Sequence, residues 1–295
     1  MSAVLVEAGP DAGAIWHFGE PNKEQRILAA GDAWADLSHR GVISVGGPDR
    51  LSWLHSITTQ DLEKLPAGLW VSALILDAQG HITHQLYLVD DGEVTWLHTE
   101  ASKTAELLAY LEKMKFMLRV DIQDRGNDYA VLRAPGEPDA LGGPYALVPY
   151  EEFEDLKSSF NPSHTQVGTW ALEAERVAAK RARLLFETDH KSIPNELGFL
   201  NNAVHMNKGC YPGQETVAKV FNLGQPPRRL ALLHLDGSVI DFPVTGDKVM
   251  MDEKEVGYIG SVARHYELGP IALAVLRRTT PEDAELTAAG VPAKQ

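Results

Sequence analysis

The chain contains 295 residues, of which 44% are hydrophobic and 23% are charged. This length and composition predict a large globular protein with two or three packed cores. The formal net charge of −14 argues against a nucleic acid or a membrane surface as partner, because binding to either needs a local excess of lysine and arginine.

The first residues include Pro10 and acidic side chains but no basic leader segment, and no run of about 20 apolar residues occurs in the sequence. Export and membrane insertion are therefore not expected. Cys210 is the only cysteine, which rules out a disulfide within the chain and fits a reducing compartment. We expect a cytoplasmic location, with a matrix-type organelle as the alternative.

The first part of the chain mixes strand-like and helix-like segments. Short apolar or alternating segments predict strands at residues 41–45, 73–76 and 82–89. A helix is predicted at residues 51–57, with Asp49 as its N-cap. A longer helix is predicted at residues 101–117, because leucine and methionine recur there at helical spacing.

Further along the chain the pattern changes from helical to strand-like. A third helix is predicted at residues 169–185, and its basic end faces either a ligand or solvent. After two adjacent prolines the pattern predicts strands at residues 230–235, 248–251, 256–263 and 271–277. The last residues are acidic and rich in alanine, which suggests a flexible tail. We therefore divide the chain into residues 1–224, a C-terminal β-domain at residues 225–280 and the tail at residues 281–295.

Residues 208–219 read KGCYPGQETVAK and carry the strongest functional signal of the chain. Gly209 and Gly213 allow a tight loop around the thiol, and a short helix is expected to follow. Cys210 then lies just ahead of a helix N-terminus. Free backbone N–H groups there and the ammonium of Lys208 both favour the thiolate. The alternative is a buried and unreactive cysteine.

This segment resembles the K-G-C-[FYW]-x-G-Q-E-x-x-[AG]-[KR] signature of the YgfZ family and matches every defined position. YgfZ proteins are folate-binding proteins that act in the assembly or repair of iron–sulfur clusters. The similarity extends to three other segments, ISVGGPDRLSWLHSITTQDLEKLPAG, SIPNELGF and VGYIGSVARHYELGPIALAVLRR. The resemblance therefore covers most of the chain.

The resemblance implies an α+β protein with an aminomethyltransferase-like folate-binding fold, in which two intertwined α+β units precede a small C-terminal β-barrel. It also implies tetrahydrofolate or a folate derivative as cofactor, and iron–sulfur client or assembly proteins as partners. The residues expected to take part in the cluster chemistry are Cys210 and Lys208. The residues expected at the folate site are Glu196, Arg176, Gln214, Glu215, Lys219 and Arg228.

Two departures separate the chain from the similar aminomethyltransferases of the glycine cleavage system. Those enzymes carry acidic residues where His84 and Gln85 stand, and a glutamate at the place of Ala178. Aminomethyl transfer to tetrahydrofolate needs a carboxylate near the folate nitrogen, which a neutral glutamine does not provide. The sequence therefore leaves open whether the protein is an enzyme. The alternative function is a folate-dependent one-carbon transferase or demethylase, with Glu196 as the substitute carboxylate.

A third hypothesis is a scaffold protein that binds a client without chemistry.

One cysteine cannot supply the roughly four thiolates that hold an iron–sulfur cluster. The histidines show no compact ligand spacing, so no resident metal site is expected. We therefore interpret His84, His190 and His205 as structural residues.

Overall fold

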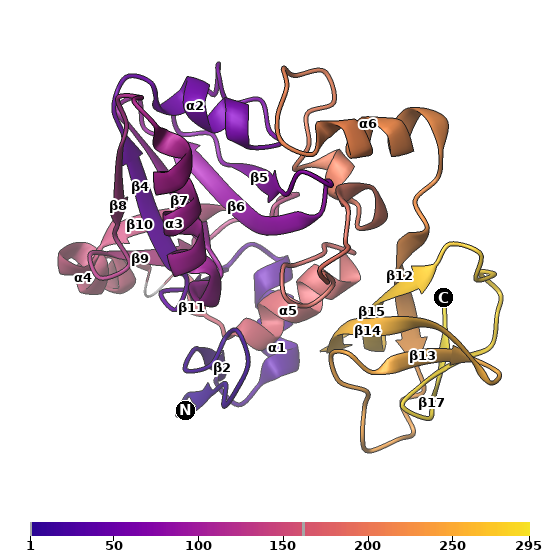
Figure 1. Ribbon diagram of the computed structural model, residues 1–295. Helices are drawn as coiled ribbons and strands as arrows, with labels where there is room; N and C mark the ends of the chain where they lie inside the picture. The colour runs from indigo at the N-terminus through magenta and orange to yellow at the C-terminus, as the bar shows by residue number, and fades with distance from the viewer. Residues whose placement is uncertain (1, 161–162) are drawn as a thin grey trace.

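The computed structural model describes residues 2–160 and 163–295. Two units of helices and sheet lie beside a β-barrel, which occupies one end of the molecule (Figure 1). The chain enters the sheet of one unit at β3 (Ala33–Asp36), completes the sheet of the other unit, and returns to the first sheet at β9 (Tyr129–Arg133). The two units are therefore intertwined.

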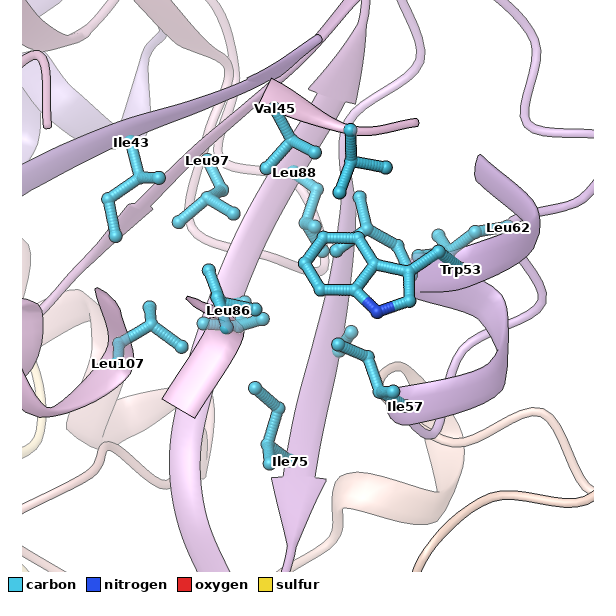
Figure 2. Packing of buried hydrophobic residues seen from close by; sticks show 14 of the residues in the cluster. Ile43, Val45, Trp53, Ile57, Leu62, Ile75, Leu86, Leu88, Leu97 and Leu107 are labelled. Carbon is cyan, nitrogen blue, oxygen red and sulfur yellow. The ribbon is translucent and has the colours of Figure 1, made fainter. Parts of the chain in front are cut away.

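One unit is built on a five-stranded antiparallel sheet in the order β5-β6-β7-β4-β8. Its strands are β4 (Gly41–Gly46), β5 (Val71–Leu76), β6 (Ile82–Asp90), β7 (Val94–Thr99) and β8 (Asp121–Asp124). Two helices, α2 (Arg50–Ile57) and α3 (Thr104–Lys115), cover one face, and the short 3₁₀ turn η1 (Ala101–Lys103) leads into α3. In Figure 2 the ring of Trp53 from α2 points toward the strand residues of this core.

The other unit is a four-stranded sheet in the order β10-β9-β3-β11, with β11 parallel to β3. Its remaining elements are β1 (Val4–Leu5), β2 (Ile15–His17), α1 (Pro21–Ala29), β10 (Tyr145–Pro149), α4 (Tyr150–Phe160), β11 (Thr165–Gln166) and α5 (Thr169–Ala178). Alternate residues of β3 face opposite sides, because side chains alternate along a strand. Ala33 and Ala35 pack with α1 and α5, whereas Trp34 packs with α4.

The segment between α5 and the barrel holds the short turns η2 (Pro194–Glu196) and η3 (Phe199–Asn201), followed by α6 (Gln214–Leu223). Gly213 precedes α6 with a positive φ of 76°, and a Cβ there would lie 2.6 Å from the carbonyl oxygen of Asp77. Glycine is therefore required where α6 begins against the β5–β6 turn. Within the described ranges, no helix combines the length and the apolar composition needed to cross a membrane.

The barrel closes in the order β12-β15-β14-β13-β16-β17. Its strands are β12 (Arg228–Leu235), β13 (Lys248–Met251), β14 (Lys254–His265), β15 (Gly269–Arg277), β16 (Leu286–Ala288) and β17 (Val291–Lys294). The expectation of a flexible tail at residues 281–295 is therefore wrong. Leu286 and Ala293 are buried in the barrel core, and a tight turn with positive φ at Ala289 and Gly290 joins the last two strands.

The predicted α+β arrangement, with two intertwined units ahead of a β-barrel, is confirmed. The helix predicted at residues 169–185 ends earlier, at Ala178, and Lys180 adopts a left-handed φ of 53°. Asp49 precedes α2 but makes no side-chain capping bond. Its carboxylate instead accepts hydrogen bonds from Arg119, which lies 70 positions away in the sequence.

Candidate functional site

A cavity of about 530 Å³ lies where β6, the segment after α5, the η2–η3 region and the start of the barrel meet. Its volume lies within the range of roughly 300–1,000 Å³ that is typical of small-molecule sites. The wall includes Tyr87 from β6, Phe199 from η3 and Arg229 from β12. All three parts of the molecule therefore contribute to this cavity.

Alternation along β6 decides which of its side chains reach the cavity. His84, Leu86 and Leu88 are buried, and the two leucines belong to the core beneath α2 and α3. Gln85 and Tyr87 line the cavity on the opposite face. The two residues that replace acidic positions of the transferases therefore point to different environments, and only Gln85 contributes to the cavity.

Gln85 is held in place by two hydrogen bonds. The N–H of Leu184 donates to its Oε1 at 2.9 Å, and its own Nε2 donates to the hydroxyl of Tyr87 at 3.0 Å. A carboxamide does not ionise or take up a net proton near neutral pH. Gln85 can therefore orient a ligand, but it does not act as a general base.

Two polar atoms in the cavity wall have no hydrogen-bond partner among the described residues. They are the hydroxyl of Ser72 and the amide oxygen of Asn202, and both atoms are buried. Buried polar groups in native proteins are nearly always paired with protein, water or ligand. These two atoms therefore fit a bound molecule with polar edges.

Cationic side chains line part of the same cavity. Lys180 is exposed and Arg229 donates only to the carbonyl of Thr280, at 3.0 Å, so neither pairs with a carboxylate in the described part of the chain. Arg181 also lines the cavity but is paired with Glu175. This side of the cavity suits an anionic ligand group.

Glu196 lines the cavity, and Arg228 occupies both of its carboxylate oxygens at 2.8 and 3.0 Å. Arg228 also donates to Asp189 at 2.6 Å. Burial alone would lower the pKa of Arg228, but its bonds to Glu196 and Asp189 raise it above its usual value. Arg228 is therefore engaged within the protein, contrary to the expectation that it meets the ligand.

Arg176 does not reach the large cavity. Its guanidinium donates to Glu173 at 2.7 Å, to Glu187 at 3.1 Å and to the hydroxyl of Ser261 at 2.5 Å. It lines a neighbouring space of about 50 Å³, which shares Tyr87 with the large cavity. Arg176 is therefore engaged within the protein, and its role at a folate stays a prediction.

Arg183 extends these contacts into a buried ionic centre. It donates to Asp11 at 2.6 Å, to Glu100 at 2.8 Å and to Glu173 at 3.1 Å. Burial alone would raise the pKa of Asp11, but hydrogen bonds from Arg183 and His39 hold it well below its usual value. The centre therefore stays ionised at neutral pH, and its charges compensate one another.

The cysteine motif lies on the loop before α6, and Cys210 is exposed to solvent. The ammonium of Lys208 donates to the backbone carbonyls of His55, Thr58 and Gln60, the last two at 2.6 and 2.9 Å. Burial lowers the pKa of Lys208 to about 8. Because all three of its donors are occupied, Lys208 anchors the loop and has no donor left for Cys210.

Gln214, Glu215 and Lys219 lie on α6, where Glu215 and Lys219 are exposed. None of the three lines the large cavity. The structure therefore does not bring these predicted folate residues to the candidate ligand site. Their position beside Cys210 leaves them on the surface that carries the thiol.

Gln60 connects the cavity wall to the motif loop. Its Nε2 donates to the carbonyls of Ser72 at 3.0 Å and Asn202 at 3.2 Å, both of which belong to residues of the cavity wall. Its own carbonyl accepts the bond from Lys208. The ligand cavity and the loop of Cys210 therefore share one hydrogen-bonded support.

Sequence reasoning missed several residues of the cavity. Tyr87 follows Gln85 by two positions on an alternating strand, so strand periodicity was a usable signal for it. Ser72 and Asn202 lie 130 positions apart and carry no motif. Within the described ranges, no group of three or more histidine, cysteine, aspartate or glutamate side chains is arranged to hold a metal ion.

The fold and the barrel define the class of protein. The structure superposes on the glycine cleavage system aminomethyltransferase T of Bartonella henselae with a TM-score of 0.83 and 18% sequence identity, covering 99% of this chain and 92% of that one. Residues 228–295 match the model of the CAF17 C-terminal beta-barrel domain. The chain therefore has the aminomethyltransferase-like fold with a CAF17-type barrel.

Sequence relatives place the chain more closely. It is 27% identical to the tRNA-modifying protein YgfZ of Edwardsiella ictaluri, over 83% of this chain and 84% of the relative. It is 25% identical to the mitochondrial iron-sulfur cluster assembly factor IBA57 homolog of Mycosarcoma maydis, over 73% of this chain and 61% of that relative. The resemblance to the YgfZ family that the cysteine motif indicates is confirmed.

Proposed function

We propose that this protein binds a reduced folate in the large cavity and uses Cys210 in the assembly or repair of iron–sulfur clusters in client proteins. One observation carries the proposal. The exposed thiol sits on a loop that Lys208 fastens to Gln60, and Gln60 also supports two residues of the cavity wall. The names of the YgfZ and IBA57 relatives point to tRNA modification and to iron–sulfur cluster assembly.

The residues of the cavity fit a folate in three respects. The unpaired atoms of Ser72 and Asn202 suit the polar edge of a pterin, and Tyr87 and Phe199 supply aromatic contact area. Arg229 and Lys180, which both line the cavity, suit the carboxylates of a glutamate tail. Tetrahydrofolate, when bound, supplies a reduced ring that carries one-carbon units.

Cys210 supplies the reactive group at the surface. The sulfur of the exposed Cys210 can coordinate iron, with loss of the thiol proton, but a single cysteine does not hold an iron–sulfur cluster. The remaining ligands must therefore come from a partner protein. The partner class in this proposal is an iron–sulfur client or assembly protein, met at the surface around the motif loop.

The alternative of a folate-dependent transferase has less support. Gln85 stands at the cavity in place of a carboxylate, and Glu196 is the one carboxylate that lines the large cavity in the described part of the chain. Because Arg228 binds both of its oxygens, Glu196 is not a free base. We therefore propose no aminomethyl transfer.

A direct role on tRNA is the second function that the names of relatives suggest. Affinity for nucleic acid depends on lysine and arginine side chains that replace counterions along the phosphates. The net charge of −14 opposes such binding. We therefore propose iron–sulfur proteins, and no nucleic acid, as direct partners. We also propose a cytoplasmic location, because the single thiol suits a reducing compartment.

Calorimetric titration with tetrahydrofolate tests the cavity. We expect wild-type protein to bind, and Arg229→Ala to bind at least tenfold more weakly, because a guanidinium–carboxylate contact is lost. Lys219→Ala is the matched control, since Lys219 is an exposed cation outside the cavity, and its affinity should equal that of the wild type. Equal affinity of Arg229→Ala, or aminomethyl transfer by the wild-type protein, would contradict the proposal.

Complementation of cells that lack the protein tests the thiol. We expect Cys210→Ser to leave iron–sulfur enzymes at the low activity of the deletion strain, while the protein accumulates to normal levels. Asn222→Ser, at an exposed position of α6, serves as the control and should restore full activity. Full activity with Cys210→Ser would remove the thiol from the proposed function.

A further inference from the structure

Three consecutive apolar side chains project into solvent at the turn between α3 and β8. Phe116 is 85% exposed, Met117 is 98% exposed and Leu118 is 42% exposed. Soluble proteins commonly expose single apolar residues, but a contiguous group of large ones marks an interaction site. We call these three residues the apolar tip.

The backbone of the apolar tip is strained. Phe116 has φ 47° and ψ −124°, and the N–H of Leu118 donates to the carbonyl of Lys115 at 3.0 Å. These values describe the first central position of a type II′ turn, where glycine is strongly preferred. A non-glycine residue at that position lowers the stability of the folded protein. The chain thus keeps a large aromatic side chain where the fold alone favours glycine.

The apolar tip is fixed in place by α2. The carboxylate of Asp49, at the start of α2, accepts hydrogen bonds from the backbone N–H of Arg119 at 2.8 Å and from its side chain at 2.8 and 3.1 Å. On the other side of the turn, Trp53 of α2 donates its indole N–H to the carbonyl of Met114 at 3.1 Å. The exposed side chains therefore project from a rigid support, which lowers the entropy cost of binding.

The other end of α2 holds the motif loop. Lys208 donates to the carbonyls of His55 and Thr58, and a Cβ built on Gly209 would lie 3.5 Å from the imidazole of His55. The eight residues of α2 span about 12 Å. Figure 1 shows α2 between the α3–β8 turn and the loop that precedes α6. The apolar tip and Cys210 therefore lie along one edge of the molecule.

The exposed surface of α2 between the apolar tip and Cys210 carries short side chains. Its exposed residues Ser52 and Ser56 turn their hydroxyls back to the carbonyls of Asp49 and Trp53, at 3.0 and 2.7 Å. No long side chain stands at these two positions. A partner can therefore contact the tip and the motif loop at the same time.

From this arrangement we propose that the apolar tip is a docking anchor for an iron–sulfur protein, which inserts the tip into an apolar cleft and so places its cluster site over Cys210. This inference rests on the proposed function of Cys210. A protein partner fits better than an anionic membrane, because Lys115 and Arg119, the two cations that directly flank the tip, are paired with Glu112 and Asp49. Aromatic side chains at the centre of an interface commonly dominate its affinity.

Phe116→Gly provides the cleanest test, because glycine relieves the backbone strain and removes the anchor at once. We expect the variant to unfold at the same or a higher temperature than the wild type and to bind tetrahydrofolate normally. In cells that lack the protein, it should restore the activity of iron–sulfur enzymes at least tenfold less efficiently per molecule. Met117→Ser should behave in the same way, whereas Ile240→Ser, which changes an 89% exposed residue of the barrel region, should restore full activity.

Overproduction separates docking from chemistry. Raising the amount of Phe116→Gly should restore enzyme activity by mass action, whereas raising the amount of Cys210→Ser should not. Normal activity of Phe116→Gly at native levels, beside an inactive Cys210→Ser, would overturn the docking proposal and leave the proposed function standing. Normal activity of both variants would overturn both. Sedimentation of wild type, but not of Phe116→Gly, with phosphatidylglycerol vesicles would also overturn the docking proposal, in favour of a membrane anchor.

Discussion

His84 and Gln85 are neighbours in the sequence, but the alternation of β6 gives them different physical fates. Gln85 faces the ligand cavity and keeps a neutral amide there. His84 is buried on the core side, where its Nδ1 lies 3.0 Å from the hydroxyl of Thr83 and its Nε2 has no hydrogen-bond partner among the described residues. A substitution of His84 should therefore alter the stability of the protein, whereas a substitution of Gln85 should alter the cavity.

Burial gives His84 a measurable effect on pH dependence. It lowers the pKa of His84 to about 4, so the unfolded chain binds a proton between about pH 6.5 and pH 4 that the folded protein excludes. This contribution to stability is present at pH 7 and is lost as the pH falls. As the pH falls from 7 to 5, protonation of His84 in the unfolded chain should lower the free energy of unfolding of the wild type by about 2 kcal/mol. Urea titrations should show a loss that is smaller by this amount in His84→Gln.

The control for that measurement is the exposed His190. His190→Gln should keep the full pH dependence of the wild type. The wild type also contains His98, whose pKa burial lowers well below its usual value, so some pH dependence should persist in His84→Gln. An identical loss of stability in wild type and His84→Gln would contradict the assignment.

Among the elements, the last two barrel strands depart most clearly from the sequence expectation. The strands β12, β14 and β15 have long apolar or alternating runs, which periodicity detects. β16 and β17 have only three and four residues, and two of their four buried positions are alanine. So short and weakly apolar a pattern resembles a tail until its pairing with β13 and β12 is known.

Removal of residues 281–295 tests the importance of these strands. The deletion leaves β12 and β13 each without a partner on one side and uncovers the barrel core, so we expect the barrel to lose its resistance to limited proteolysis. The double substitution Glu282→Ala and Asp283→Ala, at exposed positions ahead of β16, should leave that resistance unchanged. A truncated protein with a protease-resistant barrel would mean that closure is dispensable.

The beginning of α2 illustrates a second limit of sequence reasoning. The helix itself was predicted at nearly its observed position, because its apolar residues and its N-terminal aspartate are local signals. Asp49 stands at the predicted N-cap position, but its carboxylate makes no capping bond, because Arg119 supplies three hydrogen bonds to it. Local propensity locates a helix, but a partner 70 positions away decides what its first side chain does.

At the scale of the whole molecule, the cavity and the ionic centre depend on contacts that no local pattern records. The sequence left open whether the basic residues around Arg181 face a ligand or solvent, and in the structure Lys180 and Arg181 line the cavity. Arg176 and Arg183 are instead consumed by carboxylates from other parts of the fold. Charge in a sequence identifies candidates for anion binding, and only the folded arrangement shows which of them remain available.

The ionic centre also joins residues that a ribosome produces far apart in time. Arg183 binds Asp11, 172 positions earlier, and Arg176 donates to Ser261, 85 positions later. At a synthesis rate of about 5–20 residues per second, Arg183 is added to the chain roughly 10–30 s after Asp11. The five-stranded sheet can form during that interval, but the two units and the barrel cannot yet pack against one another. Because Arg229 is part of the cavity wall, the cavity is complete only after translation has passed into the barrel.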